Sequence, residues 1–428
     1  MIHIRKIWVE TINDSTYLKA TVHLDNGDEQ AWLEGVRSFL PDLYNRRLPM
    51  PLDKDGCFIM WYKVTNEYAP YLCPERADAF VVACLYFSMV SGLNIVSDIP
   101  LTSCLLYQLN EQHIPLLCNN NSGFKRVSVK APISSEIAKS KEFVGTGISC
   151  GIDSFCTILL GLKDTLPVEN RLTHLAVFNT GSLNFYGYEN ISSLQSWREE
   201  TEQELTYHLK EGKTVADELG LSFIGIDSNI PDLYQGAFLL SHTYRNLSCI
   251  LATQKMWATY YYASTGEGII YKPDLRKDAG LYDVSTVTNL SLYHLKMYTS
   301  AFEVTRMQKL EMIANHPVVQ THLNVCSHGK VNCGHCTKCK RTLLNLELLG
   351  KVEEFGKAFP DMTFYKRHRW KLLTTDVREA KRSNVFGYEM KQYAKEHSFK
   401  YGFLSDLFHL TYPLRQLRIQ IIHFLHKL

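Results

Sequence analysis

The chain of 428 residues lacks several features that would place it quickly in a class of proteins. It has no apolar stretch long enough to span a bilayer and no basic, then apolar, leader at its amino terminus, so we expect neither a membrane partner nor a targeting segment. It also lacks internal repeats and low-complexity segments. The net charge of +2 is too small to indicate a nucleic acid or a membrane surface as partner. With 45% apolar and 21% charged residues, the composition is that of a globular protein.

The 12 cysteines do not show the spacing of a disulfide framework. Most stand singly in apolar runs, as Cys84 and Cys249 do, where cysteine serves as a small apolar side chain. This usage favours a reducing, cytoplasmic location.

Four cysteines are clustered within residues 326–339, and they form the most specific local pattern in the chain. Four thiolates at this spacing give the closed tetrahedral shell of a structural Zn²⁺ site. An iron–sulfur cluster is the alternative, whereas a redox pair would need only two cysteines. His328 and His335 are alternate ligands by type, but four cysteines suffice. The expected ligands are Cys326, Cys333, Cys336 and Cys339.

The length and the pattern of the chain predict three parts. Residues 1–140 form an N-terminal α+β domain, residues 141–348 an α/β domain with a parallel sheet covered by helices on both faces, and residues 349–428 a basic helical region. The last part carries 15 Lys and Arg against 8 Asp and Glu, which leaves a charge of −5 for the rest of the chain. A solvated helical surface is the favoured interpretation of this basic region, ahead of a nucleic-acid surface.

Patterns of apolar residues predict the elements of each part. In the first part we expect a β-hairpin, a buried helix, and then a strand, a helix and a strand (17–24 with 30–33 around a turn at 25–28; 74–90; 94–99, 102–109 and 127–129). In the second part four strands alternate with helices (strands 143–148, 174–179, 222–227 and 259–263; helices after 154, over 193–219 and over 242–257). An amphipathic helix is expected over 412–428.

A short loop of small residues, 149–154, joins the first of these four strands to its helix. The start of a helix, with a glycine that lets the backbone come close, is a natural binding site for phosphate. The loop is not a Walker A loop, because it lacks the terminal Gly-Lys-Ser/Thr. An ordinary turn with a serine or aspartate cap is the alternative. Since ligands of open parallel sheets bind beyond the carboxyl ends of the strands, we expect Ser149, Asn179 and Asp227 to converge there.

The loop Ser149-Cys150-Gly151-Ile152-Asp153-Ser154 resembles the Ser-Gly-Gly-x-Asp-Ser signature of the PP-loop ATP pyrophosphatases, with Cys150 in place of the first signature glycine. Together with the downstream cysteines, it resembles the 7-cyano-7-deazaguanine synthase family, in particular the longer relatives in bacterial anti-phage defence operons. The segment 242–246 is similar to the Pro-x-Arg-Asn segment that starts a helix in the family, with His-Thr-Tyr in place of the proline context. Thr305 to Lys309 is similar to a polar segment on the substrate side.

This resemblance, which covers residues 141–348, implies a Rossmann-like sheet of the HUP type, with ATP, Mg²⁺ and structural Zn²⁺ as cofactors. It implies that ATP adenylates 7-carboxy-7-deazaguanine with release of pyrophosphate and that an amine then displaces AMP. The amine is ammonia, giving an amide or nitrile, or a protein amine in a defence system. The implied nucleotide-binding residues are Ser149, Cys150, Gly151, Ile152, Asp153, Ser154 and Asn179; the implied catalytic residues are Ser149, Asp153, Ser154, Arg245 and Lys309, with Arg306 as a further cation.

Cys150 leaves two alternatives open. As a nucleophile it would suit a sulfur-transferring or tRNA-modifying PP-loop enzyme, and as a disabling substitution it would suit a nucleotide-binding scaffold subunit; a passive small residue is the favoured interpretation. The expected partners are a deazapurine carboxylate and a protein acceptor or partner subunit, ahead of RNA.

Overall fold

The computed structural model describes residues 1–25, 27–37, 52–136, 140–183, 194–234, 237–264, 278–326 and 329–412. Its packing divides the chain into two compact units: residues 1–149 with 153–304, and residues 150–152 with 305–428. This grouping differs from the boundaries expected at 140 and 348, because the N-terminal part shares one unit with the parallel strands. The helix expected over 412–428 lies, apart from its first residue, outside the described residues.

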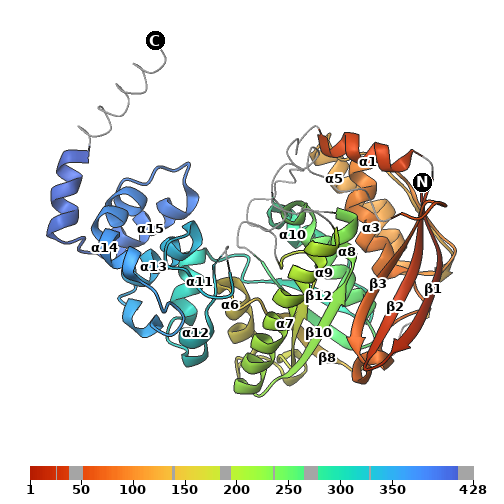
Figure 1. The fold of residues 1–428 in the computed structure, drawn as a ribbon, viewed down its shortest axis with the longest axis horizontal. Coiled ribbons are helices and arrows are strands. Elements are labelled where there is room, and N and C mark those ends of the chain that lie inside the picture. The colour runs from red at the N-terminus through yellow and green to blue at the C-terminus, as the bar shows by residue number, and fades with distance from the viewer. Residues whose placement is uncertain are drawn as a thin grey trace, which may run out of the picture. The chain divides into compact units, whose positions relative to one another are not determined.

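The first unit is built on a ten-stranded sheet, in which most neighbouring strands run parallel (Figure 1). Along the sheet the strands are β12 (Lys296–Ser300), β11 (Trp257–Ala263), β8 (Phe143–Gly147), β9 (His174–Phe178), β10 (Ser222–Ser228), β3 (Cys57–Thr65), β2 (Ser15–Leu24), β1 (Ile2–Ile12), β4 (Ile95–Ser97) and β6 (Val129–Lys130). The α/β class is therefore confirmed. A separate two-stranded sheet pairs β5 (Leu101–Thr102) with β7 (Ile133–Ser134).

Five neighbouring strands, β12-β11-β8-β9-β10, are all parallel. Numbered along this part of the chain, their order is 5-4-1-2-3. The chain moves outward from β8 to β10 and then crosses back to the other side of β8 for β11 and β12. The four predicted strands are confirmed, and β12 is a fifth that the analysis of the sequence missed. The order of the strands reverses between β8 and β11, and doubly wound sheets bind ligands beyond the carboxyl ends of the strands at such a reversal.

Helices cover both faces of this sheet. On one face α7 (Leu194–Glu218) packs against β9 and β10. Two glycines allow the close approach: a Cβ on Gly212 would lie 2.7 Å from Phe223, and one on Gly225 would lie 2.3 Å from Leu209. Since neighbouring residues of a strand face opposite sides, Ile224 and the rest of its row belong to the core of the other face.

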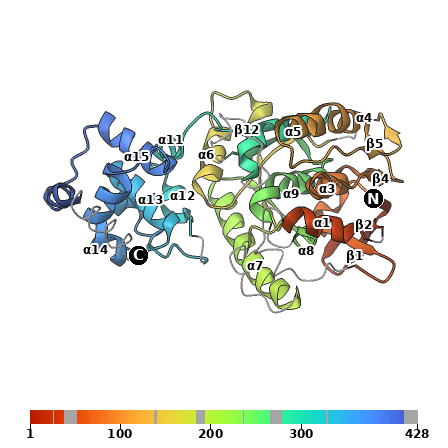
Figure 2. The same ribbon diagram turned by 90° about the horizontal axis from the view of Figure 1, so that it is seen from above.

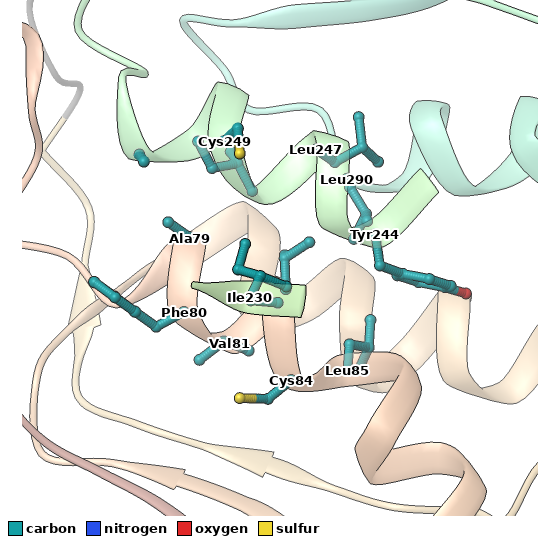
Figure 3. Packing of buried hydrophobic residues seen from close by; sticks show 14 of the residues in the cluster. Ala79, Phe80, Val81, Cys84, Leu85, Ile230, Tyr244, Leu247, Cys249 and Leu290 are labelled. Atoms are coloured by element: carbon teal, nitrogen blue, oxygen red, sulfur yellow. The ribbon is translucent and has the colours of Figure 1, made fainter. Parts of the chain in front are cut away.

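The core of that other face forms around α3 (Asp78–Ser91), every residue of which is buried, as its apolar pattern predicted. It packs against α9 (Phe238–Ala252) (Figure 2). Figure 3 shows this part of the core: Leu85 of α3 lies toward Tyr244 of α9, whereas Phe80 points away from α9 and packs against Tyr62 of β3. A helix that is apolar on all sides is stable only when it is enclosed. The core around α3 is therefore shared by the N-terminal strands and the parallel part of the sheet.

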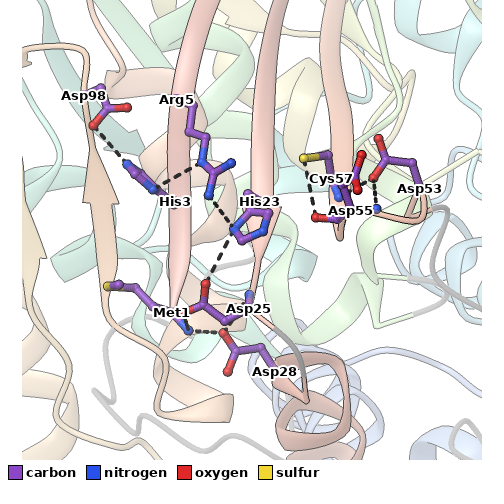
Figure 4. A network of polar contacts seen from close by, with 10 residues as sticks. All are labelled: Met1, His3, Arg5, His23, Asp25, Asp28, Asp53, Asp55, Cys57 and Asp98. Atoms are coloured by element: carbon purple, nitrogen blue, oxygen red, sulfur yellow. Dashed lines mark hydrogen bonds and ion pairs between the residues drawn. The ribbon is translucent and has the colours of Figure 1, made fainter.

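The prediction of a hairpin around residues 25–28 is wrong. Residues 30–33 lie in helix α1 (Asp28–Arg37), whose first turn carries two acidic residues that favour a helix start. The hairpin is instead β1–β2, closed at Asn13, which takes φ 53°. At the opposite end of these strands a polar network surrounds Arg5, which contacts His3 and His23 (Figure 4).

The remaining helices of the first unit are α4 (Ser103–Tyr107), α5 (Ile114–Asn120), α6 (Ile152–Gly161), α8 (Ile230–Tyr234) and α10 (Asp283–Asn289). The second unit is helical: α11 (Arg306–Ile313), α12 (Pro317–His322), α13 (Thr337–Leu348), α14 (Thr363–Leu372) and α15 (Val385–Glu396), with residues 403–412 also helical. Among the described helices, none is long and apolar enough to cross a membrane.

Candidate functional site

The loop of residues 149–154 follows the carboxyl end of β8 and runs into the first turn of α6, as the sequence predicted. Ser149 is exposed, and its Oγ lies 3.3 Å from the Oγ of buried Ser154. Asp153 is half-buried in the first turn of α6. A ten-residue helix begins here, and the first N–H groups of any helix lack partners within the helix and suit an anion.

Cys150 has a left-handed backbone, with φ 56°, and its side chain is buried. Glycine adopts this conformation without the steric penalty that a Cβ brings. The position therefore has a backbone conformation that glycine would adopt more easily than cysteine. Within the second unit, the Cys150 carbonyl accepts a hydrogen bond from the Asn324 N–H at 2.8 Å.

Of the three residues expected to converge, Asn179 after β9 and Asp227 at the end of β10 are in contact, and the approach of Ser149 to them stays a prediction. Asn179 donates from Nδ2 to the Asp227 carboxylate at 2.7 Å, and Ser228 donates from Oγ to the Asn179 carbonyl at 2.6 Å. Lys63 of β3 also pairs with Asp227, at 2.7 Å. The Oδ1 of Asn179 is buried and makes no hydrogen bond. The edge of the sheet thus retains a buried acceptor that a ligand could satisfy.

Arg245 lies in the middle of α9 rather than at a helix start, and it is fully buried. Its Nε donates to Ser241 Oγ at 2.8 Å and its Nη1 to the Thr180 carbonyl at 3.0 Å, while its Nη2 makes no hydrogen bond. The guanidinium stacks 4.4 Å from the ring centroid of Tyr234. Burial lowers the pKa of Arg245 to about 9, and among the described residues no carboxylate pairs with it. Burying a cation without a counter-charge costs free energy, so a bound anion would stabilise the guanidinium of Arg245.

One turn earlier on α9, His242 joins a chain of hydrogen bonds. Its Nδ1 lies 2.9 Å from the Tyr262 hydroxyl and its Nε2 lies 2.7 Å from an Asp278 carboxylate oxygen. Asn246 extends the chain, because it contacts Tyr262 at 3.5 Å and accepts from Thr180 Oγ1 at 2.7 Å. The chain therefore connects the carboxyl end of β11 to the segment after β9, on the two sides of β8.

Asp283, the first residue of α10, lies beside this chain and is fully buried. Burial raises its pKa to about 7, although His242 nearby favours the charged form. Neither carboxylate oxygen makes a hydrogen bond. A carboxylate of this kind titrates near neutral pH and is a recognised mark of a functional site.

Lys309 and Arg306 lie in the second unit, on α11. Thr305 and Gln308 form a capping box at the start of this helix, which accounts for the polar character of residues 305–309. Lys309 is fully buried, and Arg306 stacks 5.6 Å from the ring centroid of Phe386. Their catalytic role stays a prediction.

The four cysteines of residues 326–339 come together in the second unit, with all four Sγ atoms within 4.8 Å of one another. The Cys336 N–H lies 3.3 Å from Cys333 Sγ, and the Cys339 N–H lies 3.4 Å from Cys336 Sγ. Cys336 also caps α13. Four thiolates so close would repel one another without a cation between them, and this donor set suits Zn²⁺. The four-cysteine cluster could hold a zinc ion.

Two residues shape the cluster. Asn332 is buried and donates to the carbonyls of Leu323 and Ala358, at 2.7 and 2.9 Å, while its Oδ1 accepts from the Val325 N–H at 2.8 Å. Gly334 takes φ 69°, and a Cβ there would lie 2.1 Å from the Asp361 carbonyl oxygen. These contacts shape the backbone around the four cysteines. His335 bonds to the Cys333 carbonyl, and His328 lies outside the described residues.

Reasoning from the sequence missed several polar residues of the sheet edge. No local pattern marks Lys63 or Asp283, because each reaches the edge through pairing of distant segments. His242 was part of the segment compared with the Arg-Asn motif, but its partners Tyr262 and Asp278 carry no motif of their own.

Comparison of the chain with known protein families, with curated proteins and with solved structures finds no match.

Proposed function

We propose that this protein is an ATP-dependent, adenylate-forming ligase that binds its nucleotide at the loop of residues 149–154. The observation that supports this most directly is the order of the five parallel strands. That order puts the loop at the point beside β8 where the chain reverses its direction, and pyrophosphate groups bind at such points in doubly wound sheets.

A carboxylate is a poor electrophile, and joining it to AMP makes its carbonyl carbon reactive toward an amine. The enzyme must therefore bind the departing pyrophosphate. The N–H groups at the start of α6 and the hydroxyls of Ser149 and Ser154 suit that anion, and Asp153 is placed to hold Mg²⁺ at the phosphates. Mg²⁺ would neutralise the charge that develops as the phosphate bond breaks. Asn179, with its free acceptor, suits the nucleoside end.

The substrate class follows from the resemblance of the loop and the cysteines to the deazaguanine synthases. A 7-carboxy-7-deazaguanine is the proposed carboxylate, and ammonia or a protein amine the proposed acceptor. Arg245, a buried cation without a carboxylate partner, suits the anionic end of such a substrate. The four cysteines hold Zn²⁺ as a structural ion, because a shell of four thiolates leaves no position open for water.

The test measures exchange of labelled pyrophosphate into ATP, which requires adenylation but no acceptor amine. With 7-carboxy-7-deazaguanine and Mg²⁺ we expect exchange, and Ser149→Ala and Asp153→Ala should each lower its rate at least a hundredfold while the circular dichroism spectrum is unchanged. Cys150→Gly is the matched control, because glycine suits the backbone at this position and should retain the rate. Absence of exchange with the wild-type protein would overturn the proposal, and loss of exchange only in Cys150→Gly would favour a thiol mechanism.

A further inference from the structure

The three antiparallel strands β1, β2 and β3 (Figure 1) have one face toward the core and one toward water. Side chains alternate along each strand, and the buried rows, with Leu18 of β2 and Met60 of β3, face the core around α3. The solvated face of an antiparallel sheet is ordinarily polar. Here it carries three aromatic residues and three lysines, which we call the aromatic–lysine patch: Trp8, Tyr17, Trp61, Lys6, Lys19 and Lys63.

The pairing of the strands places these residues next to one another. Lys19, on the central strand β2, lies directly between Trp8 of β1 and Trp61 of β3. In the next row of the sheet, Tyr17 lies opposite Lys63. The ring of Tyr17 packs edge to face against that of Trp61, with 5.5 Å between the ring centroids. Since directly opposite residues of antiparallel strands are about 5 Å apart, the rings and the cations form one continuous surface.

Each lysine of the patch also lies over an aromatic ring. The Nζ atoms of Lys6, Lys19 and Lys63 lie 5.1, 5.0 and 5.9 Å from the ring centroids of Trp8, Tyr17 and Trp61, respectively. Every ring therefore has a cation beside it, and a planar group that stacks on a ring brings its own substituents close to that cation. An anion that carries planar rings fits both parts of this surface.

The patch is positively charged, although the net charge of the whole chain is only +2. Strands β1, β2 and β3, which the structure describes in full, carry four Lys and Arg and a single acidic residue, Glu10. Glu10 pairs with Lys19, and Asp227 of β10 pairs with Lys63 at 2.7 Å. Water reaches both pairs, and such ion pairs contribute little, so a phosphate can compete for these lysines. Lys6 is exposed and forms no ion pair with a described residue.

We propose that the aromatic–lysine patch binds single-stranded nucleic acid, with bases stacked on its rings and phosphates at its lysines. Unpaired bases stack on aromatic side chains whatever their sequence, and cations along the same surface follow the sugar–phosphate backbone. In other proteins, a sheet face that presents aromatic rings stacks two or three bases of single-stranded RNA in this way. The proposal is independent of the proposed function, because it uses the outer face of β1–β3 and not the loop of residues 149–154.

Fluorescence anisotropy with short labelled oligonucleotides of mixed sequence tests this. The wild-type protein should bind single strands at least tenfold more tightly than a duplex of the same sequence, because paired bases cannot stack on the rings. The affinity should fall as the salt concentration rises, since bound lysines release counterions from the phosphates. An oligoribonucleotide and an oligodeoxyribonucleotide of the same sequence are compared, and the one that binds more tightly identifies the source of the ligand.

Variants of the patch separate stacking from charge. Trp8→Leu keeps an apolar side chain but removes the ring, and it should weaken binding about tenfold, whereas Trp8→Phe should keep most of the affinity. Lys6→Gln should weaken binding to all sequences alike and lower the slope of log Kd against log salt by about one. Lys381→Gln is the matched control, because Lys381 is equally exposed but lies in the basic region of the second unit; it should bind as the wild type does.

Thermal melting confirms that each variant is folded before binding is compared. Failure of the wild-type protein to bind single strands, or equal binding of the duplex, would show that the proposal is wrong. Equal losses in Lys6→Gln and Lys381→Gln, with none in Trp8→Leu, would mean attraction by charge alone and would contradict it as well. If sedimentation shows a dimer that Trp8→Leu converts to a monomer, the patch is an interface between two copies of this chain and does not bind nucleic acid.

Discussion

The two units of this chain are stabilised in different ways. The first encloses a large apolar core between a ten-stranded sheet and the helices on it, and α3 is buried along its whole length. The second contains no strand among its described residues, and a four-cysteine cluster capping α13 stands near its beginning. Apolar burial therefore stabilises the first unit, whereas an ion held by the four cysteines would contribute to the folding of the second.

The comparison extends to charge. Both units bury ionisable groups: His113, Asp283 and Arg245 in the first, and Lys309 in the second. Burial lowers the pKa of His113 to about 3, since the charged imidazolium loses its hydration. We therefore expect pH to change the stability of the first unit and metal removal that of the second, so that each unit can be disturbed separately.

Removal of the metal should have the largest effect. Structural Zn²⁺ contributes on the order of 10 kcal/mol to the folding of small domains. Stripping the ion with a chelator, or replacing Cys336 by Ser, should abolish hydrogen-exchange protection in α13 and its neighbours. The strands of the first unit should keep their protection. Retained protection of α13 in a metal-free protein would show that the second unit does not depend on the cluster.

Two glycine substitutions, one in each unit, have the next largest expected effects and compare how each unit tolerates an added Cβ. Gly334→Ala forces a Cβ against the Asp361 carbonyl in a left-handed conformation, and we expect a loss of about 3 kcal/mol because backbone cannot move aside cheaply. Gly225→Ala in the first unit meets only the end of the Leu209 side chain and should cost about 1–2 kcal/mol. Denaturant titration followed by hydrogen exchange assigns each loss to its unit. Equal losses would argue against a rigid cluster backbone.

A change of pH should have the smallest net effect, because two buried groups of the first unit act in opposite senses. Because the pKa of His113 is lower in the folded protein than the ordinary 6.5, its contribution is complete above pH 6.5 and is lost progressively as the pH falls toward 3. The contribution of His113 alone falls by about 2 kcal/mol between pH 7 and pH 5. Asp283 acts in the opposite sense, since its raised pKa costs stability as the pH rises from about 4 to about 7.

Denaturant midpoints at pH 7 and pH 5 measure this difference. His113→Gln should lower it, because glutamine keeps a polar contact for Tyr244 but does not titrate, and Asp283→Asn should increase it. A pH dependence that His113→Gln leaves unchanged would show that another group is responsible.

The sequence predicted those elements whose pattern is local. The strand, turn and helix around residues 143–161, the helix α3 and the four cysteines were each visible within about fifteen residues. It did not predict that β3 pairs with β10, because the strands are more than 150 residues apart and their contact at Asp227 and Lys63 follows no motif. The prediction of a turn at residues 25–28 was wrong for a related reason. The segment Asp25-Asn26-Gly27-Asp28 also suits the start of a helix, and only the pairing of β2 with β3 shows that no strand follows it.

The antiparallel contact between β10 and β3 has a consequence for biosynthesis. When β1, β2 and β3 leave the ribosome, the free edge of β3 and the all-apolar helix α3 have no partners, because β10 and α9 have not yet been translated. Exposed edge strands and apolar helices of this kind are prone to associate with other chains. We therefore expect chaperones to bind the nascent polypeptide. A truncated protein that contains only the parallel strands would expose the edge of β10 in the same way.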